Sequence, residues 1–268
     1  MSDLPAWTMF PPRSRGVVAL LSVMFAVLWI GGIVSYVVLP EPPIEAKWAA
    51  PAFLATACAV AVASSQRGQL GVLIIAGLIG FASEVLGVHT GLPFGRYDYT
   101  DTLGPRFLDV PIVMSAAWLV LVAYAVYLTS LSRTKGWFKA LLAAAWMTAI
   151  DLIIDPLASG TLEYWRWRGE GSYYGVPLVN FLAWFVISFL IFMLMRERQK
   201  PNPAHRLLGA SVVLFFTLIS FAESLFIPAN VGVLVLVSQA SLEAFRRAQV
   251  GREFGRLKQN QNHELTET

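Results

Sequence analysis

Long apolar runs recur along the whole chain, and they constrain its fold more than any other feature. The first, residues 17–39, is almost unbroken, and comparable runs follow at intervals to residue 244. A helix needs about 20 mostly apolar residues to cross the hydrocarbon core of a bilayer. Only 14% of the residues are charged, whereas soluble domains carry about a quarter. We therefore expect an all-α, polytopic transmembrane helical bundle.

Eight apolar segments can be distinguished, and we expect about eight spans. The last two are separated by a short Ile-Pro-Ala step, so they are expected to form a tight helical hairpin or a span followed by a re-entrant piece. The segments cover residues 17–39, 49–65, 70–88, 110–130, 138–155, 177–195, 207–226 and 229–244.

The distribution of Lys and Arg predicts the orientation of the bundle. With eight spans, fifteen of the 20 basic residues lie on the side of the two termini and five lie on the other side. Because cytoplasmic loops carry the excess of basic residues, we expect both termini in the cytoplasm and a multi-pass protein of the plasma membrane. This topology explains the net charge of +3, so no nucleic-acid partner is expected.

One transmembrane domain is expected over residues 1–245, with a catalytic-type core at about 70–227. The remaining segment, 246–268, is polar and is expected to be a disordered cytoplasmic tail.

The chain offers few ligands for a metal or a disulfide. The single cysteine, Cys58, lies in an apolar run, so neither a disulfide framework nor a cysteine metal site is expected. His205 and His263 fall on the expected cytoplasmic side, which leaves only His89 near the acids described below. We expect no metal and no cofactor. His89 is expected to be a hydrogen-bonded loop residue, with a lone metal ligand or a proton relay as the alternatives.

Two loops on the expected non-cytoplasmic side are rich in aromatic residues, glycine and proline. They cover residues 89–109 and 155–177. An aromatic belt at the membrane interface is the simpler interpretation, and it suits Trp165 and Trp167. Alternating charges in the first loop favour instead a folded, hydrogen-bonded lid over a cavity. These charges are Arg96, Asp98, Asp101, Arg106 and Asp109.

Five acidic residues from four apolar segments fall near the same expected membrane face. A charged side chain at the centre of a membrane helix costs about 2.5–3.5 kcal/mol on insertion scales, so such residues are rare and mark functional sites. Glu84 lies inside the third segment, and Asp151 and Asp155 share one helix face at i,i+4. The other two are Asp109 and Glu223.

Three of these acids also have simpler structural interpretations. Asp109 can be the N-cap of the fourth span, Asp155 precedes a proline and can end its helix, and Glu223 can pair with a loop arginine. Glu84 and Asp151 lie inside apolar runs, where such interpretations do not apply. We therefore expect Glu84, Asp151 and Asp155 to be the catalytic residues.

Acids in this setting suggest a definite chemistry. A carboxylic acid in an apolar pocket can stay protonated at neutral pH and can then protonate an alkene. A neighbouring ionised carboxylate can stabilise the resulting cation and orient water, and aromatic faces can add cation–π attraction. The residues expected to bind substrate or support the acids are His89, Arg96, Tyr97, Tyr99, Asp109, Trp118, Tyr174, Asn180, Trp184 and Glu223.

A series of motifs between about residues 70 and 190 carries a family resemblance. They are Glu84 with GVHTGLPFGRYDY at 87–99, Leu103-Gly104, Val110-Pro111, Ala117-Trp118, DLIIDPLA at 151–158 and YGVPLVNFLAW at 174–184. In this order they resemble the CruF-type carotenoid 1,2-hydratases, a family that includes the bisanhydrobacterioruberin hydratases.

The resemblance implies a redox-neutral, cofactor-independent reaction. Water adds across the terminal C1,2 double bond of an acyclic carotenoid ψ-end, as in lycopene or γ-carotene, and gives a tertiary 1-hydroxy group. The carotenoid would enter sideways from the bilayer, and other carotenoid-synthesis enzymes would be possible partners.

Two other functions remain open at this point. Intramembrane acids also serve proton-coupled transporters of small or lipophilic solutes. Transporters usually show internal repeats and sites at the bilayer midplane, whereas this sequence has no convincing repeat and its acids lie off-centre. A non-catalytic scaffold in a pigment-synthesis complex is the third reading.

Overall fold

The computed structural model describes residues 12–39, 48–195 and 201–266, and it confirms the all-α, polytopic prediction. Eight α-helices account for most of this part of the chain. They are α1 (Pro12–Ile33), α2 (Ala49–Ser64), α3 (Arg67–Thr90), α4 (Val113–Ser130), α5 (Gly136–Ser159), α6 (Leu178–Met195), α7 (Pro203–Ala222) and α8 (Phe226–Thr266). A π-helical turn, η2 (Val34–Val38), continues α1.

Seven of the described helices are long and apolar enough to cross a membrane, and α2, with 16 residues, is shorter. At 1.5 Å per residue, α2 measures about 24 Å, whereas the hydrocarbon core is about 30 Å thick. The eight expected segments are therefore all helical, and length and composition alone support seven spans.

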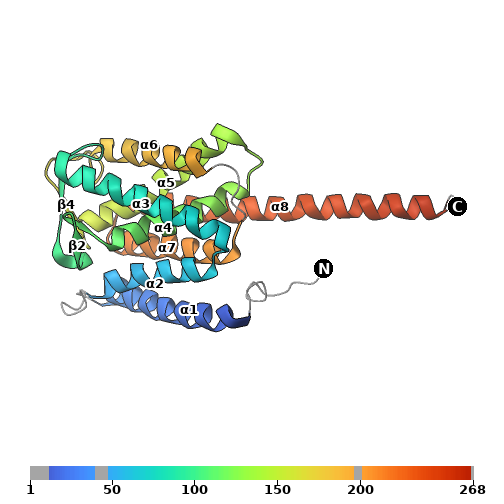
Figure 1. Ribbon diagram of the computed structural model, residues 1–268, viewed down its shortest axis with the longest axis horizontal. Helices are drawn as coiled ribbons and strands as arrows, with labels where there is room; N and C mark the ends of the chain where they lie inside the picture. Colours follow the sequence, from blue (N-terminus) through green and yellow to red (C-terminus); the bar gives the residue numbers. More distant parts are fainter. Residues whose placement is uncertain (1–11, 40–47, 196–200, 267–268) are drawn as a thin grey trace.

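Helix α4 occupies the centre of the bundle, and α2, α3, α5 and α7 pack around it. Its 18-residue apolar window is 72% buried, the highest share among the described spans. A helix that is apolar on all sides belongs in such a position. In Figure 1, α1 and α2 form a layer below α7. The 18-residue apolar window of the span that contains α1 is only 6% buried. Helix α1 therefore presents most of its surface to lipid.

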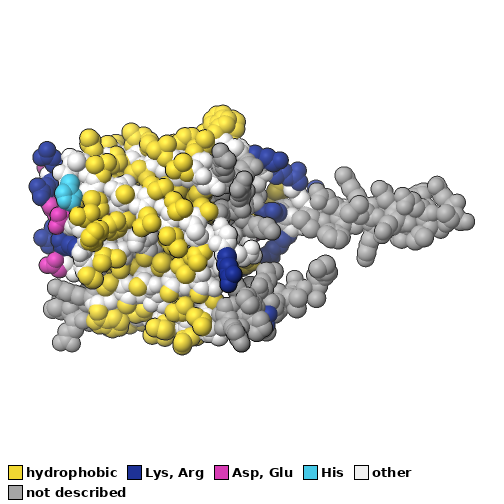
Figure 2. Space-filling view, in the orientation of Figure 1, with side chains coloured by type: hydrophobic (Ala, Val, Ile, Leu, Met, Phe, Trp, Pro, Cys, Tyr) yellow, Lys and Arg dark blue, Asp and Glu magenta, His cyan; other side chains and the backbone are white. Residues whose placement is uncertain are grey.

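The two ends of the bundle differ in chemistry. All the short strands lie at one end, and α8 projects from the other (Figure 1). Figure 2 shows an apolar band around the middle, acidic and basic side chains together at the strand end, and basic residues at the α8 end. This arrangement fits the basic end expected from the sequence, and the assignment of that end to the cytoplasm stays a prediction.

The tail differs from the sequence expectation. A disordered segment is predicted from residue 246, whereas the structure continues α8 as a helix to Thr266. The segment contains no proline and is rich in Glu, Gln, Lys and Arg, which are good helix formers. Its polar composition therefore does not interrupt the helix that begins at Phe226.

The two aromatic loops join into one lid over the strand end of the bundle. Strand β1 (Tyr97–Tyr99) pairs antiparallel with β4 (Trp165–Trp167), and the register places Asp98 opposite Arg166. Strands β2 (Arg106–Phe107) and β3 (Val110–Pro111) form a hairpin, and a 3-10 turn, η4 (Asp101–Leu103), precedes β2. A small sheet therefore ties together segments almost 70 residues apart.

The hairpin corrects the prediction that Asp109 caps the fourth span. Leu108 and Asp109 form its two-residue turn, and both have positive φ, 51° and 61°. Two successive residues with positive φ are typical of a type I′ hairpin turn, where Asp is tolerated. Helix α4 begins only at Val113, and no side chain caps it.

Candidate active site

Glu84 is buried beneath the lid and accepts three hydrogen bonds from aromatic side chains. Its side chain lies on α3 in a residue that is 4% exposed. Oε2 accepts from the hydroxyls of Tyr97 at 2.5 Å and Tyr99 at 2.9 Å, and Oε1 accepts from Nε1 of Trp118 at 3.0 Å. The three predicted residues around Glu84 are thus brought together by the structure.

The β1 strand explains why both tyrosines reach Glu84. Side chains alternate along a strand, so Tyr97 and Tyr99 face the bundle while Asp98 faces out. Burial, and secondarily the Glu84 carboxylate, raise the pKa of both phenols well above the ordinary value. Both tyrosines therefore keep their protons and act as donors to Glu84.

Asp151 and Asp155 form a second buried group, bridged by Asn180. The two acids are 2% and 1% exposed and lie one turn apart on α5. Nδ2 of Asn180 on α6 donates to Oδ2 of Asp151 at 2.8 Å and to Oδ2 of Asp155 at 2.6 Å. The geometry confirms that Asp151 and Asp155 lie one turn apart on the same helix, and Asn180 contacts both; the functional role of Asn180 stays a prediction.

Two lid tryptophans complete the environment of Asp155. Nε1 of Trp165 donates to Oδ1 of Asp155 at 2.9 Å, and Nε1 of Trp167 donates to the same oxygen at 3.2 Å. The interpretation of these tryptophans as a plain interface belt is therefore wrong. Their Trp-Arg-Trp spacing is the available sequence signal, because residues two apart on a strand share a face.

Asp151 differs from the other two acids in its hydrogen bonding. Glu84 and Asp155 each accept three hydrogen bonds. Within the described part of the chain, Asp151 accepts one, from Asn180. None of the three acids forms an ion pair with a described residue. Asp151 thus has the most freedom to present a carboxyl group to a bound molecule.

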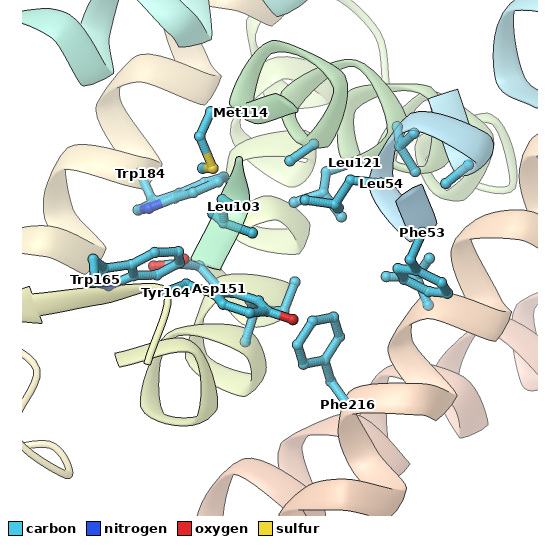
Figure 3. Close-up of a pocket in the computed structure, with 15 residues that line it drawn as sticks. Phe53, Leu54, Leu103, Met114, Leu121, Asp151, Tyr164, Trp165, Trp184 and Phe216 are labelled. Carbon is cyan, nitrogen blue, oxygen red and sulfur yellow. The ribbon is translucent and has the colours of Figure 1, made fainter. Parts of the chain in front are cut away.

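Asp151 faces an apolar cavity of about 60 Å³. Figure 3 shows its carboxylate beside Trp165 and Tyr164, with Trp184 and Met114 nearby. Apart from this acid, the wall is formed by apolar and aromatic residues of α2, α4, α5, α6, α7 and the lid. A cavity of this composition suits a hydrocarbon, and Asp151 is its acidic group.

A second cavity, of about 20 Å³, lies under the lid beside Glu84, Asp155 and Asn180. A cavity needs about 10–15 Å³ and two to four polar partners to hold one water molecule. The carboxylates, the tyrosine hydroxyls and the Asn180 amide provide such partners. The two cavities share Met114, Trp165 and Trp184 in their walls, so a water-sized polar space adjoins an apolar one.

Trp118 and Trp184 form a stacked pair at this shared wall. Their ring centroids are 4.1 Å apart and the planes differ by 6°. Trp184 lines both cavities, and Trp118 connects the pair to Glu84 through its N–H group. An indole face next to the apolar cavity can stabilise a cation by cation–π attraction.

Ion pairs on the outer surface hold the lid together. Arg168 donates from Nε and from a terminal nitrogen to the two carboxylate oxygens of Asp98, each at 2.5 Å. The hydrogen bond from Arg168 lowers the pKa of Asp98, so the pair stays ionised at neutral pH. Arg106 pairs with Asp101 at 2.7 Å. The prediction of a folded, hydrogen-bonded lid is confirmed.

Five predicted residues lie outside the two buried groups. Asp109 is exposed and lies 3.4 Å from Nε2 of His89, whose Nδ1 contacts the Val85 carbonyl at 2.8 Å. His89 is hydrogen-bonded, as expected, but it lies in the last turn of α3 rather than in the loop. Arg96 is exposed. The other two are Glu223, exposed and accepting from Thr161 at 3.0 Å, and Tyr174, whose hydroxyl accepts from the Ile227 N–H at 3.4 Å.

These positions correct the expectation that five acids converge. Glu223 follows the last residue of α7 and points to the surface, and Asp109 lies in the outer hairpin turn. Depth along the membrane does not determine the direction in which a side chain points. Within the described ranges, no group of three or more His, Cys, Asp and Glu side chains is arranged to hold a metal ion.

Gly80 allows α3 to approach Trp118 closely, so Gly80→Ala is expected to disturb the site. A Cβ at this position would lie 2.1 Å from Cγ of Trp118. Overpacking of this kind costs about 1–3 kcal/mol, and here it displaces a donor to Glu84. Thermal unfolding of the purified protein should show a lower midpoint. Gly71→Ala, on the same helix with open space around it, is the control, and equal midpoints for the two variants would contradict this packing.

Fold and site together define a polytopic α-helical membrane protein with buried carboxylates under a sheet-containing lid, at the boundary of an apolar and a polar cavity. The family model described as "Carotenoid biosynthesis protein" matches residues 48–239, and the chain belongs to this family. This membership confirms the resemblance expected from the sequence. The matched region contains every buried acid of the site and leaves out α1 and the C-terminal part of α8.

One curated relative is the bisanhydrobacterioruberin hydratase of Haloarcula japonica. It is 31% identical over 128 residues, which cover 45% of this chain and 43% of the relative. The match thus spans less than half of that protein. No solved structure matches this chain.

Proposed function

We propose that this protein is a carotenoid hydratase that adds water across the terminal C1,2 double bond of an acyclic ψ-end. Family membership and the hydratase named among the relatives support a carotenoid substrate. The observation that carries the proposal is the pair of adjoining cavities, one apolar with Asp151 in its wall and one water-sized and polar.

In the proposed reaction, Asp151 carries the proton. The cavity around it excludes most polar groups, and a carboxyl group in contact with the alkene can transfer its proton to C2. The electron pair of the double bond forms the new C–H bond, and a tertiary cation remains at C1. Trp184, which stacks on Trp118, lies in the wall where this cation would form, and its indole face stabilises positive charge.

Water then attacks C1 from the polar cavity. Glu84 and Asp155 line this cavity, and their donors hold both carboxylates in fixed orientations. Either carboxylate can orient the water and accept the proton that it loses when the C–O bond forms. Asn180 holds Asp155 and Asp151 in one hydrogen-bonded group, and a further water molecule can carry the proton back from the accepting carboxylate to Asp151. The sum is one water added to one alkene, with no change of oxidation state.

Expression in cells that accumulate lycopene or γ-carotene tests the proposal. The expected result is a carotenoid heavier by one water, and two waters if both ends react. An unchanged carotenoid pool, with the protein present and folded in the membrane, would contradict a hydratase and favour the transporter or scaffold alternatives.

A further inference from the structure

The apolar cavity is too small for its proposed substrate in the form seen here. A cavity of about 150 Å³ is known to bind a molecule as small as benzene, and this one measures about 60 Å³. Even a terminal isoprenoid group therefore requires the wall to move. The rest of the polyene must leave the bundle through that wall, because the carotenoid is far longer than the cavity.

The cavity extends from Asp151 toward the contact between α2 and α7, which we call the seam. Figure 3 shows Trp165, Trp184 and Asp151 on one side, and Phe53 and Phe216 on the opposite side. Phe53 belongs to α2 and Phe216 to α7. Among the described elements, α1 and its continuation η2 form the outer layer beyond them, and the apolar window of this span is 6% buried and therefore faces lipid.

Aromatic rings close this seam near the lid. Phe53 stacks on Phe215 of α7 with a centroid distance of 5.0 Å, and on Phe25 of α1 at 4.9 Å. These stacked rings are not hydrogen-bonded to one another, so they can separate and come together again without breaking a hydrogen bond. A polyene passing between these rings would exchange one apolar contact for another.

The other end of the same seam is held by hydrogen bonds. Nδ2 of Asn202 on the α7 side donates to the Ser64 carbonyl at 2.9 Å, and Nε2 of His205 lies 3.1 Å from the Ser65 hydroxyl. His205 is 3% exposed, so breaking these bonds would leave buried polar groups unpaired. Helix α2 is therefore fixed to α7 at one end and held by apolar contacts at the other.

We propose that the seam between α2 and α7 is a lateral portal through which the polyene reaches Asp151, and that Phe53 is its gate. Opening is a tilt of α2 about its hydrogen-bonded end that separates the rings of Phe25, Phe53 and Phe215. The portal rests on the proposed function, since it assumes a linear carotenoid as the bound molecule.

Photo-crosslinking from position 25 tests the portal, because Phe25 lies in the seam but does not line the cavity. Phe25 is replaced by p-benzoylphenylalanine, which keeps an aromatic ring, in cells that make an acyclic carotenoid. Leu182 on α6, 62% exposed on the outer surface of the bundle, receives the same group as the control for random encounters in the bilayer. After irradiation, the carotenoid attached to each purified protein is measured by mass spectrometry.

Several-fold more carotenoid adduct at position 25 than at position 182 is expected. Equal or lower adduct at position 25 would overturn the portal, and if the carotenoid pool is still hydrated, the proposed function stands without it. Enriched adduct at position 25 with no hydration would support the portal while contradicting the hydratase. The amounts of the two variant proteins in the membrane fraction are measured as well, and equal amounts show that a difference in adduct does not come from a difference in insertion.

Discussion

Asp151→Asn is expected to abolish hydration while the protein still folds and inserts. The amide has nearly the same shape as the carboxyl group and can remain in contact with Asn180, but it cannot donate a proton to an alkene. Loss of a general acid lowers rates by about 100- to 10,000-fold. Product formed per amount of inserted protein, measured from a lycopene-producing host, should fall to this extent.

Asp109→Asn is the matched control for that experiment. It makes the same chemical change in an exposed turn, with positive φ that Asn tolerates. Its product yield is expected to equal that of the unchanged protein. Wild-type turnover in Asp151→Asn would remove Asp151 from the mechanism, whatever Asp109→Asn shows.

Glu84→Gln is expected to lower both stability and product yield. Both carboxylate oxygens of Glu84 accept hydrogen bonds, from three donors in all. In Gln one of these oxygens is replaced by an NH2 group, which is itself a donor. The donors that face this NH2 group would therefore have no acceptor. Each buried donor left unpaired costs about 1–3 kcal/mol. The displaced Trp118 and Tyr97 would also disturb the polar cavity. Thermal unfolding in detergent and product yield should both fall.

The control for Glu84→Gln is Glu163→Gln in the lid. Glu163 is exposed, and its one ion pair with a described residue is with Arg166, at 3.3 Å on the surface. Such pairs contribute about 0–1 kcal/mol. A midpoint of Glu84→Gln that matches that of Glu163→Gln would mean that the three donors around Glu84 do not hold the site together.

Much of the buried site is visible in the sequence because the bilayer makes polar residues conspicuous. Glu84 and Asp151 interrupt apolar runs, and the spacing of Asp151 and Asp155 places them on one helix face. Helix periodicity is local, so these inferences need no knowledge of tertiary structure. Asn180 is conspicuous for the same reason.

The lid could be predicted only in part. Charges and aromatics indicate a folded loop, but the pairing of Tyr97–Tyr99 with Trp165–Trp167 joins segments far apart in the chain. Three-residue strands carry too little pattern to reveal a partner. Trp165 and Trp167 therefore resemble an interface belt until the sheet shows both N–H groups reaching Asp155.

Asp109 and Glu223 were expected in the buried site but lie outside it. Their positions near the same membrane face suggest that they join the buried acids, yet each lies where a helix or hairpin turns outward. Position along the membrane normal can be estimated from the sequence, whereas the direction of a side chain at the end of a helix depends on the following loop.

The fate of isotopes from labelled water tests the central claim most directly. Membranes with the protein and an acyclic carotenoid are incubated in water enriched in heavy oxygen and deuterium, and the product is analysed by mass spectrometry and NMR. The account predicts heavy oxygen on C1 and deuterium on C2, with Asp151→Asn forming neither bond. Product oxygen that comes from dioxygen, or labelled product at an undiminished rate from Asp151→Asn, would contradict it.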